Sequence, residues 1–139
     1  MRKIDTIIIH CSATPEGRDY TVAQIRDWHV RGNGWQDIGY HFVVYRDGTV
    51  HAGRDINKVG AHCTGHNTDS IGICYIGGTA SDGSNTPKDT RTPEQKKSLR
   101  ELVATLCRQY GISPSRVYGH NEFAAKACPC FDVGKEFRP

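Results

Sequence analysis

Short apolar segments of two different periods alternate along this chain, and this pattern constrains the fold more than any other feature. Residues 4–10 are rich in β-branched side chains, which is typical of a buried strand. A helix is expected from Thr21, because Thr21 and Gln24 have the spacing of a capping box. Further strands are expected at 42–45, 49–51, 71–76 and 116–118. Strands and helices therefore interleave, which is the pattern of an α/β domain.

The strongest helix signal lies over residues 93–110. Thr92 is a good cap, Pro93 occupies the first helical position, and Gln95 completes a second capping box. Apolar residues follow at helical spacing, and Gly111 is the expected stop.

A hairpin turn and a polar loop complete the expected fold. Asp47-Gly48 is a hairpin signal, so one pair of strands should be antiparallel. Residues 77–91 are rich in small polar residues and predict a loop. We expect one domain over residues 1–139, with a central mixed β-sheet flanked by helices.

The overall composition argues against several classes of protein. Apolar runs reach only about four residues, whereas a transmembrane helix needs about 20, so we expect no membrane insertion. A net charge of +3 without a concentrated basic stripe does not favour nucleic acid. The first residues lack the apolar stretch of a secretion signal, so we expect synthesis in the cytoplasm.

Seven histidines and six cysteines are the unusual part of the composition. Cytoplasmic thiols stay reduced, so we do not expect a disulfide framework. Cys74 and Cys107 lie inside apolar patterns and are interpreted as core residues. The candidates for chemistry are Cys11, Cys63, Cys128 and Cys130.

Three of these polar residues could form a metal site in a surface groove at the strand ends. His10 ends the first expected strand, His120 follows the last one, and Cys128 comes eight residues later. Two imidazoles and a thiolate suit Zn²⁺ and leave a fourth position open, as in catalytic zinc sites. Spacing alone also allows loop histidines and a buried thiol, so it leaves both readings open.

A series of segments decides between them, because they match a known family in the same order over nearly the whole chain. They are residues 8–14, 25–29, 34–42, 46–50, 52–55, 59–62, 67–73 and 120–129. In these segments the chain resembles the zinc-dependent N-acetylmuramoyl-L-alanine amidases of the phage lysozyme and peptidoglycan-recognition-protein superfamily.

The resemblance implies a set of site residues. It implies His10, His120 and Cys128 as ligands of one catalytic Zn²⁺, and Tyr40 and Lys126 as catalytic partners. Lys126 is expected to stabilise an oxyanion. Tyr40 could orient the water or the substrate, or protonate the leaving amine.

Other residues have expected places around this site. His62 and Asn67 border the substrate groove in relatives and are expected to contact the stem peptide. His41 is interpreted as structural or as a support of the site. Cys130 is expected to be an exposed, oxidation-sensitive thiol rather than a ligand, since a fourth protein ligand would close the site. Cys11 should point away from the metal by strand alternation.

The resemblance implies hydrolysis of the amide bond between N-acetylmuramic acid and L-alanine in peptidoglycan or a muropeptide. We expect a monomeric phage or prophage endolysin that acts on the cell wall after release. Two alternatives are a recognition module that binds peptidoglycan without cutting it and a cytosolic enzyme that recycles muropeptides. Recognition proteins without zinc typically lack the cysteine ligand, so the presence of Cys128 favours the enzyme.

Overall fold

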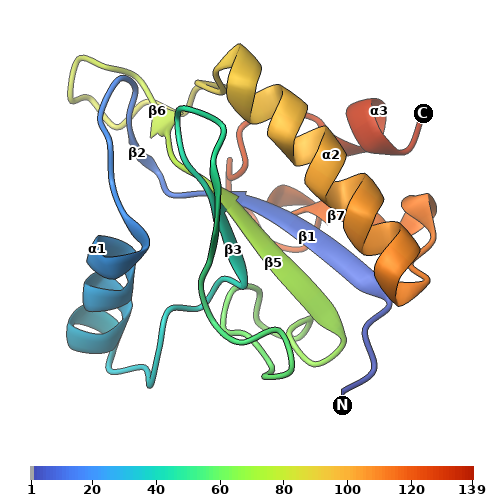
Figure 1. The fold of residues 1–139 in the computed structure, drawn as a ribbon. Helices are drawn as coiled ribbons and strands as arrows, with labels where there is room; N and C mark the ends of the chain where they lie inside the picture. The colour runs from blue at the N-terminus through green and yellow to red at the C-terminus, as the bar shows by residue number, and fades with distance from the viewer. Residues whose placement is uncertain (1) are drawn as a thin grey trace.

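Five strands form a mixed sheet in the computed structural model, which describes residues 2–139 (Figure 1). In spatial order they are β4 (Val50–Ala52), β3 (Phe42–Val44), β5 (Ser70–Tyr75), β1 (Thr6–Cys11) and β7 (Val117–Gly119). β1 pairs in parallel with β5 and β7, β3 is parallel to β5, and β4 is antiparallel to β3. The predicted mixed sheet is therefore confirmed, with the apolar strands β1 and β5 near its centre.

The helices lie on both sides of this sheet. Figure 1 shows α2 (Pro93–Tyr110) and α3 (Val133–Phe137) on one side of the molecule and α1 (Val22–Asp27) on the other. Both predicted capping boxes are present, at Thr21 and Thr92. Gly111 ends α2 in the left-handed conformation, with φ 67°, which glycine adopts without steric cost. Three further helical turns are Trp28–Gly32, Pro114–Arg116 and His120–Glu122.

Alternation along the strands produces two separate apolar cores. Ile7, Ile9 and Cys11 belong to a core that also contains Leu99 and Val103 of α2. A smaller core on the α1 side comprises Val22, Ile25, Ile38, Val43 and Ile76. Even-numbered β1 residues thus face away from α2, and His10 is one of them.

The expected loop at 77–91 contributes one strand to a second, very small sheet. β2 (Thr14–Pro15) pairs in parallel with β6 (Gly78–Thr79). Two-residue strands carry no measurable alternation, so the sequence pattern did not predict this pair. The glycine at 78 has φ 111° there, a conformation that an L side chain rarely adopts.

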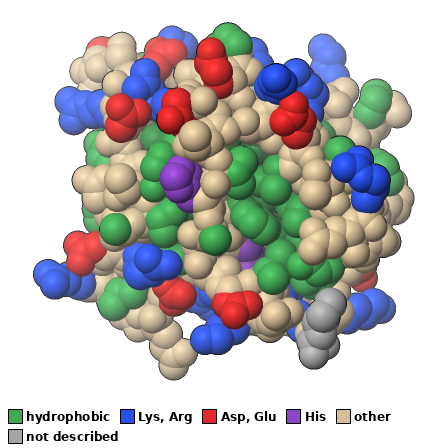
Figure 2. Space-filling view, viewed as in Figure 1, with side chains coloured by type: hydrophobic (Ala, Val, Ile, Leu, Met, Phe, Trp, Pro, Cys, Tyr) green, Lys and Arg blue, Asp and Glu red, His purple; other side chains and the backbone are tan. Residues whose placement is uncertain are grey.

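None of the helices within residues 2–139 is long and apolar enough to cross a membrane. Figure 2 shows Lys and Arg interspersed with Asp and Glu around the edge of the visible face, while hydrophobic side chains gather near its centre. This face therefore carries no broad electrostatic field of one sign.

Candidate metal centre and active site

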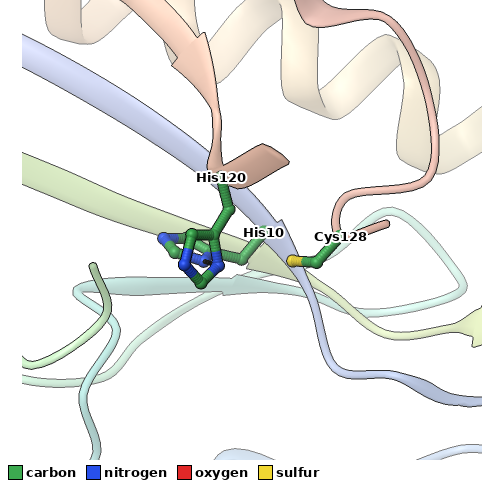
Figure 3. Close-up of side chains that lie close together, drawn as sticks. All are labelled: His10, His120 and Cys128. Atoms are coloured by element: carbon green, nitrogen blue, oxygen red, sulfur yellow. Dashed lines mark hydrogen bonds between the residues drawn. The ribbon is translucent and has the colours of Figure 1, made fainter. Parts of the chain in front are cut away.

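The three predicted metal ligands converge in space. The ligand atoms of His10, His120 and Cys128 all lie within 4.8 Å of one another (Figure 3). The Nδ1 atoms of the two histidines are 3.0 Å apart. Imidazole nitrogens and a thiolate sulfur are the donors that Zn²⁺ prefers, so this set fits that ion.

Strand pairing explains how residues 110 positions apart meet. His10 lies near the end of β1, and Ile9 pairs with Gly119 of β7. His120 follows Gly119 directly, so the parallel register brings both rings to the same edge of the sheet. A Cβ at position 119 would lie 2.7 Å from Asn121 Oδ1, so glycine allows this sharp exit from the strand.

The sulfur of Cys128 is held by the backbone of β1. The N–H of Cys11 donates to Cys128 Sγ at 3.1 Å. Hydrogen bonds of this kind orient a ligand and tune its electron density. The side chain of Cys11 packs into the core on the α2 side, as strand alternation predicted.

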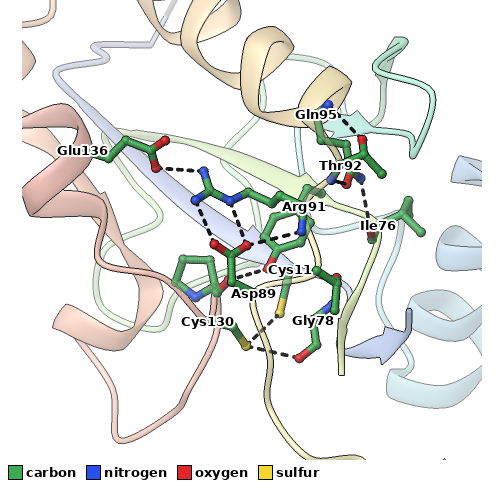
Figure 4. A network of polar contacts seen from close by, with 12 residues as sticks. Cys11, Ile76, Gly78, Asp89, Arg91, Thr92, Gln95, Cys130 and Glu136 are labelled. Carbon is green, nitrogen blue, oxygen red and sulfur yellow. Dashed lines mark hydrogen bonds and ion pairs between the residues drawn. The ribbon is translucent and has the colours of Figure 1, made fainter. Parts of the chain in front are cut away.

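Cys130 does not match the expectation of an exposed thiol. It is only partly exposed, and its Sγ contacts the carbonyl oxygen of Gly78 at 3.3 Å and Cys11 Sγ at 4.0 Å (Figure 4). Burial raises the pKa of Cys130 to about 12, so the thiolate needed for oxidation is scarce. Cys130 is partly covered because it packs, like Cys128 and Phe131, against the apolar core on the α2 side.

Burial favours the neutral form of both candidate histidine ligands. Burial, followed by the neighbouring histidines and Lys126, lowers the pKa of His10 well below its ordinary value. Burial and Lys126 also lower the pKa of His120. A neutral imidazole has one nitrogen lone pair, which is what a metal ion requires.

A chain of hydrogen bonds extends from His10 into the protein. His10 Nε2 lies 2.8 Å from His62 Nδ1, and His62 Nε2 lies 3.2 Å from Ser70 Oγ. The Ser70 hydroxyl donates to the carbonyl oxygen of His66 at 2.7 Å. Burial lowers the pKa of His62 to about 3, so this ring is also neutral. The sequence offered no signal for this partner of His10, because the two residues are 52 positions apart.

Tyr40 lies beside the candidate metal ligand His10. Its ring centroid is 5.2 Å from that of His10. Burial raises the pKa of Tyr40 well above 10, so the hydroxyl keeps its proton at neutral pH. His29 supports this region: its ring lies 5.5 Å from Tyr40 and 4.8 Å from Trp35, and its Nδ1 accepts the N–H of Gly39 at 2.9 Å.

A cavity of about 370 Å³ adjoins the candidate ligands. Its lining comprises Trp35, Ala61, His62, Cys63, Thr64, Asn67, His120 and Lys126. The structure thus brings the predicted residues His62, Asn67 and Lys126 to one cavity that the candidate ligand His120 also lines. Asn67 Oδ1 accepts the N–H groups of His62 and Cys63, both at 2.9 Å, and so braces the cavity wall.

This arrangement suits hydrolysis of an amide, and comparison with known proteins gives the same result. The model of the N-acetylmuramoyl-L-alanine amidase family matches residues 1–131. The chain belongs to this family. The amidase cleaves the bond between N-acetylmuramic acid and L-alanine in peptidoglycan, and the predicted enzyme class is confirmed.

Curated relatives of the amidase include two phage endolysins. It is 46% identical over 129 residues to the endolysin of Escherichia phage T7, covering 93% of this chain and 82% of the relative. It is 45% identical over 127 residues to the endolysin of Klebsiella phage KP32, covering 91% and 81%.

Solved structures show the same fold. The amidase is similar to N-acetylmuramoyl-L-alanine amidase LysC from Clostridium intestinale URNW, with a TM-score of 0.79, 26% identity, and coverage of 99% of this chain and 87% of that one. It is also similar to Drosophila PGRP-LB, with a TM-score of 0.76, 28% identity, and coverage of 93% and 76%. These likenesses confirm the predicted fold class.

Proposed function

We propose that the amidase is a zinc-dependent endolysin that holds one catalytic Zn²⁺ with His10, His120 and Cys128. The observation that carries this proposal is the convergence of two neutral imidazoles and a sulfur within 4.8 Å, next to a cavity. Three protein ligands leave one coordination position for water or substrate, which distinguishes catalytic zinc sites from structural ones.

Zinc at this position would supply Lewis acidity and activate a water molecule for attack on the amide carbon. The protein contributes the surroundings. The N–H of Cys11 holds the sulfur, and the neutral rings of His10 and His120 keep lone pairs available. A negatively charged sulfur ligand lowers the net positive charge of the centre and moderates its acidity.

Lys126 and Tyr40 have complementary roles in this proposal. Lys126 lines the cavity beside His120, and its ammonium group stabilises the negative charge that develops on the amide oxygen. Tyr40 keeps its proton and therefore acts as a hydrogen-bond donor, which orients the substrate next to His10. The same proton is available to the leaving amine of L-alanine.

The cavity wall provides the proposed contacts to the stem peptide. Asn67 uses its Oδ1 to hold the backbone, so we assign its amide nitrogen to the substrate. Both ring nitrogens of His62 bond within the protein, so a contact from this residue would involve a carbon edge of its ring.

The proposed biological setting follows from the phage relatives. The chain spans four-fifths of the endolysins of Escherichia phage T7 and Klebsiella phage KP32. We propose a monomeric phage or prophage enzyme that is made in the cytoplasm and acts on the cell wall after release.

The test is digestion of purified cell walls with the metal-loaded protein, with and without a chelator. New L-alanine amino termini without new reducing sugar ends are expected, and the chelator should suppress them. A metal-loaded protein that binds walls but releases no amino termini would instead be a recognition module. Digestion that is unaffected after the metal has been removed would refute the zinc assignment.

A further inference from the structure

His62 contacts the candidate metal ligand His10, and its ring is closely packed against two glycines. Its ring is buried beside β5, with Gly72 on one side. A Cβ on Gly72 would lie 2.6 Å from two ring atoms of His62, and one on Gly60 would lie 2.8 Å from Cδ2. Glycine within a strand often marks such a close approach. Two glycines therefore leave the space that this ring occupies.

The direction of the hydrogen bonds around His62 follows from counting hydrogens. Ser70 has one hydroxyl hydrogen, and it donates that hydrogen to the carbonyl oxygen of His66 at 2.7 Å. At the 3.2 Å contact with His62 Nε2, the serine oxygen must then accept. His62 consequently carries its proton on Nε2, and its Nδ1 is left with a lone pair.

The same argument continues to the metal ligand. His62 Nδ1 accepts at the 2.8 Å contact, so His10 Nε2 must be the donor. A neutral His10 with its proton on Nε2 has its lone pair on Nδ1, the atom 3.0 Å from His120 Nδ1. The opposite direction would place a hydrogen on His10 Nδ1, where the metal is expected, and would leave the His66 carbonyl without this donor.

We propose that His62, oriented by Ser70 and the His66 carbonyl, is a positioning residue that fixes the metal-binding tautomer of His10. This inference rests on the proposed zinc site and adds to it a residue that acts through a ligand. The partner of a ligand histidine is usually a carboxylate, a carbonyl or water. Here a neutral histidine has this role. The carbonyl oxygen of His66, which accepts the last hydrogen bond of the series, fixes the donor and acceptor in each of the others.

Two substitutions at position 62 separate positioning from packing. His62→Leu preserves most of the buried volume but removes the acceptor, while His62→Asn is smaller but keeps an oxygen near the position of Nδ1. We expect zinc affinity, measured by chelator competition, to fall about 10–100-fold in His62→Leu and distinctly less in His62→Asn. A role in packing alone predicts the reverse order. His51→Leu, which removes a histidine stacked on Tyr45 of the hairpin, is the control and should bind zinc like the wild type.

The tautomer of His10 can be measured directly in the zinc-free protein, without an activity assay. In ¹⁵N NMR spectra of the zinc-free protein, His10 should be protonated at Nε2 and unprotonated at Nδ1. Ser70→Ala should populate the reverse tautomer, because the group that sets the direction is gone. Gly72→Ala should displace the His62 ring and weaken zinc binding.

The outcomes distinguish this inference from the proposed function. A His10 protonated at Nδ1 in the wild type would overturn the inference, as would wild-type zinc affinity in His62→Leu. A wild-type protein that binds no zinc would refute the zinc site instead. The NMR measurement would still determine the tautomer of His10 and the direction of the hydrogen bonds from His10 to His66. If His62→Leu fails to fold, Ser70→Ala and the wild-type spectrum carry the test.

Discussion

Strand β1 presents two surfaces of different character on alternate residues. Ile7 and Ile9 pack against α2, where stabilisation comes from apolar area and does not depend on direction. His10, on the other surface, is equally buried, but each of its ring nitrogens has a specific polar neighbour. The same degree of burial therefore has different consequences. The surface of Ile7 and Ile9 should tolerate substitutions that conserve volume, whereas the contacts of His10 depend on which ring nitrogen carries the hydrogen.

The α2 side also holds the segment that carries the candidate sulfur ligand, Cys128. Arg91, 5% exposed, pairs with Asp89 and Glu136 and so links the loop before α2 to α3 (Figure 4). The Tyr75 hydroxyl donates to the carbonyl oxygen of Pro129 at 2.6 Å. The position of Cys128 thus depends on contacts on the α2 side of the sheet, although its sulfur lies near His10 and His120.

The largest effect should come from Cys128→Ala, which removes a candidate metal ligand at the edge of the α2-side core. A metal ion contributes several kcal/mol to such a reaction, so activity should fall by at least about 10³-fold and zinc should no longer bind tightly. The measurements are zinc content after dialysis and release of amino termini from cell walls. Cys130→Ala, two residues away, is the control and should retain zinc. Retention of zinc and activity in Cys128→Ala would refute the ligand assignment.

Leu99→Ala should affect the opposite surface. This fully buried α2 residue belongs to the same core as Ile7 and Ile9 of β1, and its truncation should lower the free energy of unfolding by about 2–5 kcal/mol. Urea denaturation of the zinc-free protein measures this loss. The zinc affinity of the folded fraction should stay unchanged. A change in affinity comparable to that of a ligand variant would show that the two surfaces are not independent.

Lys126→Ala should spare both the fold and the metal. Loss of one group that stabilises an oxyanion costs about 10²–10³-fold in turnover, so we expect a decrease of this size at unchanged zinc content. Steady-state assays on a soluble muropeptide would separate turnover from binding. Lys97→Ala, on the exposed face of α2, is the matched control and should have wild-type activity. Loss of zinc together with turnover would instead assign Lys126 to the integrity of the site.

Local signals were enough to predict much of this fold. Both capping boxes and the glycine stop at the end of α2 depend on residues within one helical turn, so the sequence displays them directly. The convergence of the three candidate ligands could be predicted because strand ends and the ordered family segments indicate it. His10, His120 and Cys128 then converge through β-sheet register.

What the sequence could not predict depends on contacts distant along the chain. The pairing of His10 with His62 arises from how a loop folds over β5, and no local pattern encodes it. The N–H of Cys11 as a donor to Cys128 is a backbone group, which is the same in every non-proline residue. The prediction that Cys130 is exposed is wrong for the same reason, since its burial depends on contacts with Gly78 of β6 and with the core.

His41 is a third buried histidine, besides His10 and His62, and its polar contacts hold parts of the fold together. Its Nδ1 accepts the N–H of Gly72 at 3.0 Å, and its Nε2 lies 2.8 Å from the carbonyl oxygen of Lys58. These contacts join β5 to the segment after β4, which agrees with the structural role expected from the sequence. Nearby are Arg2 at 3.1 Å and the ring of His62 at 5.9 Å.

Stability should therefore depend on pH through His41, and this is the smallest of the expected effects. Burial is the main cause that lowers the pKa of His41 to about 4; Arg2 and Arg54 also lower it, whereas Asp55 and the Lys58 carbonyl raise it. In the unfolded chain the pKa is about 6.5, so between these values the unfolded state binds the extra proton. The stabilising contribution is complete above about pH 6.5 and is lost as the pH falls toward 4.

The difference between the wild type and His41→Gln isolates this contribution, because the other histidines titrate in both proteins. Glutamine can still donate to the Lys58 carbonyl but does not titrate. Wild-type stability should fall by on the order of 2 kcal/mol more than that of the variant between pH 7 and pH 4. Urea denaturation of both zinc-free proteins across this range measures it. Parallel pH profiles would mean that His41 titrates normally in the folded protein, and the burial of a neutral ring would then be confined to the candidate metal site.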